Sequence, residues 1–204
     1  MISIYQLKPR FQVLLRPLCR WLAQNGVTAN QVTIAAVVLS ALGGIWILWS
    51  PTSPWVLIAL PVILFIRMAL NAIDGMLARE FAMKSHLGAL LNEMGDVVAD
   101  TCLYLPLALH PDVPLWGMVG LVLLGTMVEM IGVVAVQIGT ERRYDGPFGK
   151  SDRAFAVGLL ALLLGLNIPI GTWIGWYLTL AIILSILTLV NRGKKTLDQS
   201  GSAT

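Results

Sequence analysis

The sequence predicts an all-α polytopic membrane protein, with six transmembrane helices preceded by an N-terminal amphipathic interfacial helix. Of its 204 residues, 57% are hydrophobic and 12% are charged, whereas soluble domains carry about 25% charged residues. Several apolar runs reach about 20 residues, the length that crosses the hydrocarbon layer of a bilayer. The net charge is +3, and the basic residues lie at the ends of the apolar runs, where orientation signals are expected. This pattern argues against nucleic-acid binding.

The first 26 residues predict a helix that lies on the membrane surface. Lys8, Arg10, Arg16 and Arg20 are interleaved with large apolar side chains, which is typical of an interfacial amphipathic helix. A small-residue cleavage site does not follow an apolar core, so a signal peptide is not indicated. We therefore expect residues 1–26 to form a retained interfacial helix.

One membrane domain, residues 27–193, contains the six apolar segments. Thr28 or Asn30 is the expected N-cap of the first segment, and residues 194–204 are expected to form a disordered cytoplasmic tail. The expected spans are residues 30–50, a run from Trp55 to the region of Asp74, residues 86–110, residues 115–139, and two segments within 154–191 that are divided near 167–172.

The positions of Lys and Arg predict the orientation of these spans. Thirteen of the fourteen basic residues lie in four places: the N-terminal segment, the loops at 79–84 and 142–153, and the tail after Asn191. The turns near 51–54, 110–114 and 167–172 contain none. By the positive-inside rule, both termini and both basic loops face the cytoplasm. We expect an integral protein of a prokaryotic cytoplasmic membrane.

A polar cluster interrupts the second and third spans between residues 71 and 100. Ionisable groups at membrane depth are costly, so such a cluster indicates a functional site. Helical spacing places its members on two stripes, which two antiparallel helices would set opposite each other. The first stripe contains Asn71, Asp74 and Ala78, and the second contains Gly88, Asn92, Asp96 and Asp100.

The side chains of this cluster favour a hard divalent cation. Carboxylate and amide oxygens suit Mg²⁺ or Mn²⁺, whereas zinc usually recruits Cys or His. Arg79, next to the cluster, can bind a phosphate oxygen. The composition predicts phosphoryl chemistry at a lipid surface and an active site on the cytoplasmic side. Cation-coupled transport is the alternative from another class, although no pair of broken helices at the bilayer midplane is visible.

The spacing Asn71-x2-Asp74-Gly75-x2-Ala78-Arg79-x8-Gly88-x3-Asn92-x3-Asp96 resembles the signature of the CDP-alcohol phosphotransferase family. The spacing agrees across all 26 residues, and such a long gapped pattern is far more specific than a short motif. The resemblance implies six spans after an amphipathic helix, a homodimer, and transfer of a phosphoalcohol from a donor such as CDP-diacylglycerol to a small polar acceptor alcohol, with release of CMP.

The resemblance also implies the roles of individual residues. Asp96 is the expected general base that takes the proton of the acceptor hydroxyl. One or two Mg²⁺ or Mn²⁺ ions are expected at Asn71, Asp74, Asn92 and Asp96. The CDP moiety is expected at Gly75, Ala78 and Arg79.

The sequence departs from the family signature at two positions, because Asn71 and Asn92 stand where the first and third aspartates are expected. An amide can coordinate a cation through its carbonyl oxygen but supplies no charge. We therefore expect weaker metal binding, with Asp100 as a further candidate ligand that restores charge. A degenerate family member that binds a CDP-lipid without turnover is a second alternative.

Four charged residues outside the motif have two interpretations each. Lys150 and Arg153 lie three residues apart after a glycine-rich turn and can reach one anionic group, so they are candidates for the phosphate of an acceptor or headgroup. Positive-inside topology alone explains part of this basic loop. Arg67 is expected to form a structural ion pair with Glu129 or Asp100, or else to contact substrate phosphate. Glu129, in the fourth span, is expected to be a paired structural charge, or else a proton or cation site.

Overall fold

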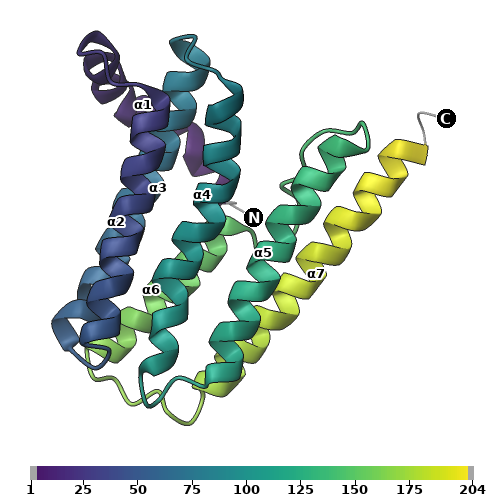
Figure 1. Ribbon diagram of the computed structural model, residues 1–204. Coiled ribbons are helices and arrows are strands. Elements are labelled where there is room, and N and C mark those ends of the chain that lie inside the picture. The colour runs from purple at the N-terminus through teal and green to yellow at the C-terminus, as the bar shows by residue number, and fades with distance from the viewer. Residues whose placement is uncertain (1–3, 202–204) are drawn as a thin grey trace.

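The computed structural model describes residues 4–201, and this part of the chain contains α-helices, one 3-10 helix and no strands. The helices run side by side as a bundle, with α1 outside it (Figure 1). Their bounds are α1 Ile4–Gln24, α2 Ala29–Trp49, α3 Pro54–Glu80, α4 His86–Tyr104, the 3-10 helix η1 Leu105–Leu109, α5 Leu115–Gln137, α6 Lys150–Gly165 and α7 Ile174–Gly201.

Local capping explains where three of the helices begin. Thr28 is the N-cap of α2: its Oγ1 accepts from the Gln31 backbone N–H at 3.3 Å, and the Gln31 side chain accepts from the Thr28 N–H at 2.9 Å. Ser85 caps α4, and the Asp152 carboxylate accepts from the Gly149 N–H at the start of α6 at 2.9 Å. Such caps satisfy backbone N–H groups that the first helical turn leaves unpaired.

The third apolar segment is not one continuous α-helix. α4 ends at Tyr104, and η1 carries the chain to Leu109. Pro106 has no N–H to donate and its ring crowds the preceding turn, so the α-helix gives way to a tighter one.

The C-terminal helix differs from the prediction, because α7 continues to Gly201 where a disordered tail was expected from residue 194. The Arg143 guanidinium donates to the Lys195 carbonyl at 2.9 Å, and the Lys195 ammonium donates to Asp145 at 2.6 Å. The loop before α6 therefore anchors the last turns of α7. Residues 202–204 of the predicted tail lie outside the described residues.

Four helices in the described part of the chain are long and apolar enough to cross a membrane, namely α2, α3, α5 and α7. α4 carries Glu93, Asp96 and Asp100, and α6 has only 16 residues. The predicted crossing of the membrane by α4 and α6 stays a prediction. The turns without Lys or Arg gather at the lower end of the bundle in Figure 1, and the loop between α3 and α4 lies at the opposite end.

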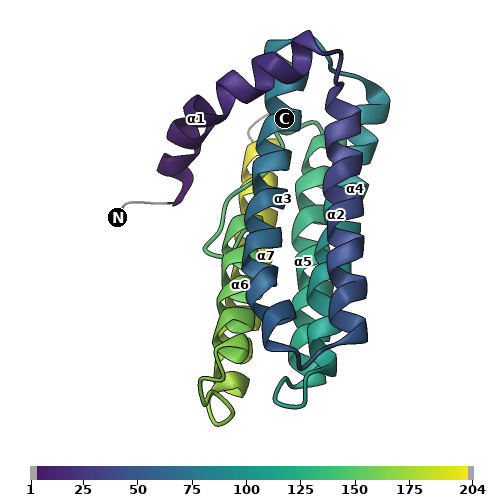
Figure 2. The ribbon, with the colours of Figure 1, turned by 90° about the vertical axis from the view of Figure 1, so that its left-hand side faces the viewer.

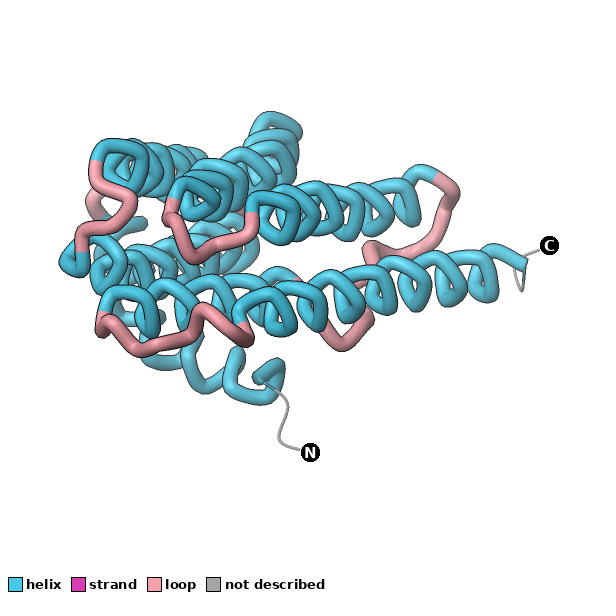
Figure 3. The backbone as a smooth tube through the Cα atoms, turned by 90° about the horizontal axis from the view of Figure 1, so that it is seen from below, coloured by secondary structure: helices cyan, strands magenta, loops and turns pink. Residues whose placement is uncertain are grey.

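Helix α2 packs against both α3 and α4, the two helices that carry the polar residues between 71 and 100. The approach of α2 to α4 is close at Gly44: a Cβ there would lie 2.1 Å from the carbonyl oxygen of Cys102. Helix α3 packs against α6, and α5 packs against α7 and α4. Figure 3 shows the bundle from below, from the end at which the turns without Lys or Arg lie.

Helix α1 lies outside the bundle and is inclined to it (Figure 2). Cys19 is fully buried and packs with Ile73, Met76 and Leu77 of α3. An exposed ion pair joins Arg16 to Glu80 at 3.1 Å. The helix predicted for residues 1–26 is therefore present as Ile4–Gln24 and docks on α3, while its position at a membrane surface stays a prediction.

Candidate active site

The two predicted polar stripes meet, and side chains of α2 and α6 contact them as well. α3 and α4 both pack on α2 and have few close backbone contacts with each other. Polar side chains bridge them: Asn71 on α3 donates from Nδ2 to Oδ1 of Asp96 on α4 at 3.1 Å. Side chains rather than backbone packing therefore join the two halves of the motif.

Asp74 lies on the same face of α3 as Asn71 and is buried. Its Oδ2 accepts a hydrogen bond from the Thr33 hydroxyl of α2 at 2.7 Å. Sequence reasoning missed Thr33, because a single threonine in an apolar span carries no local signal of function. Thr33 also donates to the Ala29 carbonyl, so its position is fixed by its own helix.

Asp96 is half-buried and lies among three cationic or donor groups. Besides Asn71, its Oδ1 contacts the ammonium group of Lys150 at the start of α6 and lies 3.7 Å from Arg67. Arg67 also donates to the Asp96 backbone carbonyl at 3.2 Å. Lys150, a candidate for a substrate phosphate, is thus paired with the proposed general base in this structure.

The predicted CDP-binding residues form the outer part of the site. Arg79 is exposed, and its guanidinium folds back over Gly75, where a Cβ would lie 3.2 Å from the nearest nitrogen. Arg79 has no salt bridge among the residues that the structure describes. Ala78 is half-buried one residue before it. At Gly88 on α4 a Cβ would lie 2.7 Å from Oδ1 of Asn30 on α2, so a larger residue there would displace the Asn30 side chain.

Asn92 is half-buried one turn before Asp96, and the described part of the chain offers it no side-chain hydrogen bond. The neighbouring Glu93 points elsewhere, as its rotation about the helix predicts, and forms an ion pair with Arg142. Asn92 therefore lies one helical turn from Asp96 on α4, and no side-chain hydrogen bond in the described part of the chain fixes its orientation.

Asp100 is held in ion pairs and is not free to bind a cation. Its Oδ1 is 2.5 Å from Arg67 and its Oδ2 is 3.5 Å from Arg153. Both carboxylate oxygens of Asp100 are paired with arginines whose side chains are each only 1% exposed. The structural ion pair predicted for Arg67 is therefore present, with Asp100 as its partner, and we leave Asp100 out of the proposed set of metal ligands.

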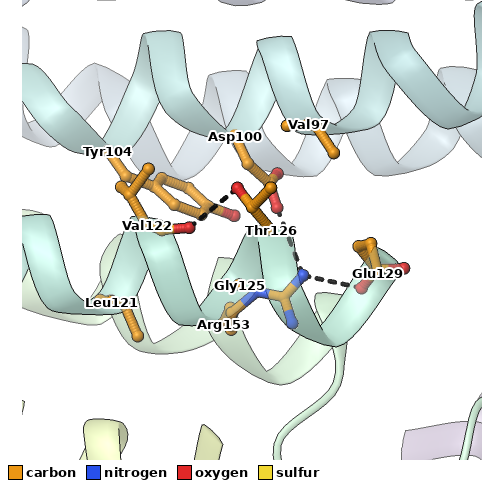
Figure 4. A pocket seen from close by; sticks show the side chains of 9 residues that line it. All are labelled: Val97, Asp100, Tyr104, Leu121, Val122, Gly125, Thr126, Glu129 and Arg153. Carbon is orange, nitrogen blue, oxygen red and sulfur yellow. Dashed lines mark hydrogen bonds and ion pairs between the residues drawn. The ribbon is translucent and has the colours of Figure 1, made fainter. Parts of the chain in front are cut away.

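Arg153 is likewise buried rather than open to a substrate. It bridges Asp100 and Glu129, with 2.9 Å between its Nη2 and the Glu129 carboxylate. Figure 4 shows these three side chains lining a small cavity between α4, α5 and α6. The expectation that Glu129 serves as a paired structural charge is confirmed, and an acceptor phosphate does not have free access to Arg153.

The side chains around Asp96 fit a hard cation, but with few charges. Among the described residues, no three His, Cys, Asp or Glu side chains gather in a way that could hold a metal ion. Asp74 and Asp96 are the two carboxylates, and the Oδ2 of Asp96 and the carbonyl of Asn71 make no hydrogen bond within the described part of the chain. Oxygen ligands of this kind suit Mg²⁺ or Mn²⁺.

The loop between α5 and α6 has its own ion pairs outside the membrane-spanning helices. The hydrogen bond from Lys195 holds the pKa of the Asp145 carboxyl below its ordinary value, and Arg143 acts in the same direction from 3.7 Å. Asp145 therefore stays ionised at neutral pH and ties the loop to α7.

Together these features define an all-helical membrane protein with a polar site among α2, α3, α4 and α6. The chain belongs to the CDP-alcohol phosphatidyltransferase family, because the model of that family matches residues 26–189. It is 43% identical over 199 residues to the inner membrane protein YnbA of Escherichia coli strain K12, with 98% of each chain covered. It is 27% identical over 199 residues to an uncharacterized protein of Aquifex aeolicus strain VF5, with 95% of each covered.

The fold is similar to that of phosphatidylinositol phosphate synthase PgsA1 of Mycobacterium tuberculosis. The TM-score is 0.70 to the structure with CDP-DAG bound, at 22% identity, with 88% of this chain and 92% of that chain covered. It is 0.72 to the complex with manganese and citrate, at 22% identity, with 89% and 88% covered. These likenesses show that the two proteins share a fold.

Proposed function

We propose that this protein transfers a phosphoalcohol group, most simply a phosphatidyl group, from a CDP-linked donor such as CDP-diacylglycerol to the hydroxyl of a small polar acceptor, with release of CMP. The carrying observation is the hydrogen bond between Asn71 and Asp96. It joins the first and last positions of a motif that spans two helices. The family membership and the donor named for PgsA1 support this reading of the motif.

In this proposal Asp96 is the general base. Its carboxylate accepts the proton of the acceptor hydroxyl as that oxygen attacks the β-phosphorus of the donor, and the bond to the CMP oxygen breaks. Positioned proton transfer of this kind contributes about 10²–10⁴-fold to a rate. Lys150 contacts Oδ1 of Asp96, and Arg67 lies 3.7 Å from the same oxygen, so the two cations orient the carboxylate.

Asp74, Asp96 and the amide oxygens of Asn71 and Asn92 are the residues we propose to hold one Mg²⁺ or Mn²⁺ ion. A bound cation of this type supplies positive charge to phosphate oxygens during displacement. The manganese complex of PgsA1 supports the choice of metal. Two carboxylates supply less charge than four, which favours one ion over two.

The donor pyrophosphate needs a cation, and Arg79 has no salt bridge within the part of the chain that the structure describes. Gly75 and Ala78 leave space beside it for the cytidine diphosphate. Because Arg79 is exposed at the end of α3, the donor can reach it from the membrane surface, where its acyl chains remain in lipid.

We further propose that the protein lies in a cytoplasmic membrane with six spans, α1 at the interface, and both termini and the site on the cytoplasmic side. The positive-inside distribution of Lys and Arg supports this orientation. A homodimer, implied by the family resemblance, belongs to the same proposal.

The proposal is tested by incubating the purified protein with Mn²⁺ or Mg²⁺, CDP-diacylglycerol and a pool of polar alcohols, and measuring CMP. Release that depends on an acceptor supports the transferase. Tight binding of the CDP-lipid without CMP release indicates a degenerate member. Either of these two results argues against cation transport as the main role of the motif. Absence of both donor binding and CMP release would contradict the proposal.

A further inference from the structure

Three arginines from different parts of the chain converge on the buried carboxylate of Glu129. The distances to it are 2.9 Å from Arg153 on α6, 3.3 Å from Arg142 in the preceding loop, and 3.9 Å from Arg192 on α7. The Glu129 side chain is 9% exposed. We call these four residues the Glu129 cluster. Its members come from α5, α6, α7 and a loop, so only the folded chain creates it.

The Glu129 cluster is connected to the proposed base through alternating charges. Arg67 contacts both Asp96 and Asp100, and Asp100 in turn contacts Arg153. On α6, Lys150 at Asp96 and Arg153 at Glu129 lie three residues apart and share a face. The cluster therefore lies about one helical turn from Asp96, on the side of α5 and α7.

The cations on this side of the site all have carboxylate partners from the chain itself. Arg142 is paired with Glu93 as well as Glu129. Arg192 is held mainly by backbone carbonyls, at 2.5 Å to Val128 and 3.1 Å to Asp145. Arg79, by contrast, has no salt bridge in the described part of the chain. Within the described residues, the proposed donor site thus offers a cation without a salt bridge, whereas the Glu129 cluster does not.

Three guanidinium groups around one point form a pocket suited to an anion such as a phosphate. In this protein the carboxylate of Glu129 already occupies that point. A phosphate entering between the arginines would meet the negative charge of Glu129 in a poorly hydrated environment, where like charges repel strongly. An uncharged alcohol meets no such electrostatic barrier.

We propose that Glu129 is an internal substitute for an anionic substrate group and that it restricts the acceptor to alcohols without a phosphate. This inference rests on the proposed transferase function, and Glu129 acts in it as a residue that determines specificity. It reverses the expectation, drawn from Lys150 and Arg153, that the acceptor carries a phosphate.

Inorganic phosphate is the first probe, because its binding does not depend on turnover. Thermal unfolding is measured in detergent with phosphate and with chloride at equal ionic strength, for the wild type and for Glu129→Gln. We expect no phosphate-specific stabilisation of the wild type. In Glu129→Gln the like charge is removed, so phosphate affinity rises by more than about tenfold. The double variant Glu129→Gln/Arg142→Gln removes one arginine as well and loses most of this gain.

Specific stabilisation of the wild type by phosphate, equal to that of Glu129→Gln, would overturn the inference. If Glu129→Gln does not fold, Glu93→Gln is compared with the wild type instead: equal phosphate effects in the two overturn the inference, and a larger effect in Glu93→Gln supports it. Glu93→Gln, whose side chain is 30% exposed, serves as a milder variant with a smaller gain in the same direction.

The second readout is CMP release by the wild type with glycerol and with glycerol 3-phosphate as acceptors. We expect a rate with the neutral alcohol that exceeds the rate with its phosphate, and a shift toward the phosphate in Glu129→Gln. Preference of the wild type for glycerol 3-phosphate contradicts the inference. Failure of every acceptor contradicts the proposed function instead, and phosphate binding then still tests the role of Glu129.

Discussion

Asn71 and Asp96, 25 residues apart in the sequence, are joined by a hydrogen bond of 3.1 Å between helices that have few backbone contacts with each other. An amide at position 71 satisfies this contact without metal, because its N–H₂ group donates to the carboxylate. A carboxylate at the same place would repel Asp96 until a cation entered. The amide therefore stabilises the contact between α3 and α4 without needing a cation.

The variant Asn71→Asp/Asn92→Asp tests this effect of the amides. We expect it to unfold at a lower temperature than the wild type without metal, and to gain more stability from Mn²⁺, because added carboxylates raise the affinity for a hard cation. Thermal unfolding with a Mn²⁺ titration measures both changes. Asn167→Asp, on an exposed turn, is the control. Equal Mn²⁺ effects in wild type and double variant contradict the account.

The buried ion pair between Arg67 and Asp100 predicts a large loss of stability on truncation. Arg67→Gln removes a guanidinium that is 1% exposed and leaves Asp100 and Asp96 with less compensation. Breaking a buried pair costs about 3–5 kcal/mol, measurable as a lower midpoint of unfolding in detergent. The same substitution in the exposed Arg16–Glu80 pair is the control and should change stability little. Similar effects for both variants would disprove the structural role of Arg67.

The contact of α2 with α4 predicts that Gly44 tolerates no larger residue. A Cβ 2.1 Å from the Cys102 carbonyl forces two backbones apart, so Gly44→Ala should destabilise by about 3 kcal/mol, the upper part of the usual range for overpacking. Gly175→Ala in α7, where a Cβ meets nothing within 4 Å, is the matched control and should be neutral or slightly stabilising. The midpoints of unfolding of Gly44→Ala and Gly175→Ala, each compared with that of the wild type, test this prediction.

The last turns of α7 are predicted to depend on the charge of Asp145. Because its pKa is lowered in the folded protein, the ion pair with Lys195 stabilises the fold above the unfolded pKa of about 3.9. That contribution is lost as the pH falls through the lower folded value. Asp145→Asn should therefore speed hydrogen exchange in residues 193–201 at neutral pH. Asp198→Asn, exposed on the same helix, should not, and equal exchange in both variants would be evidence against the anchor.

The sequence predicts the motif helices well because their signals are local. The apolar runs, the caps and the spacing from Asn71 to Asp96 act within one helix or across a short loop. The partners of Asp100 and Arg153 are different, since they depend on how α4, α5 and α6 pack. Asp100 therefore looked like a free ligand, and Arg153 like an open phosphate site. Thr33 and the length of α7 were missed for the same reason: their contacts come from distant segments.

The central claim is that Asp96 serves as the base in acceptor-dependent transfer from a CDP-lipid. The most direct measurement is the rate of CMP release from CDP-diacylglycerol with Mn²⁺ and a neutral acceptor alcohol, for the wild type, Asp96→Asn and the control Asp198→Asn. The account predicts a rate that falls by about 10²–10⁴-fold in Asp96→Asn, with donor binding retained, and an unchanged rate in the control. A folded Asp96→Asn protein that releases CMP at the wild-type rate would contradict it.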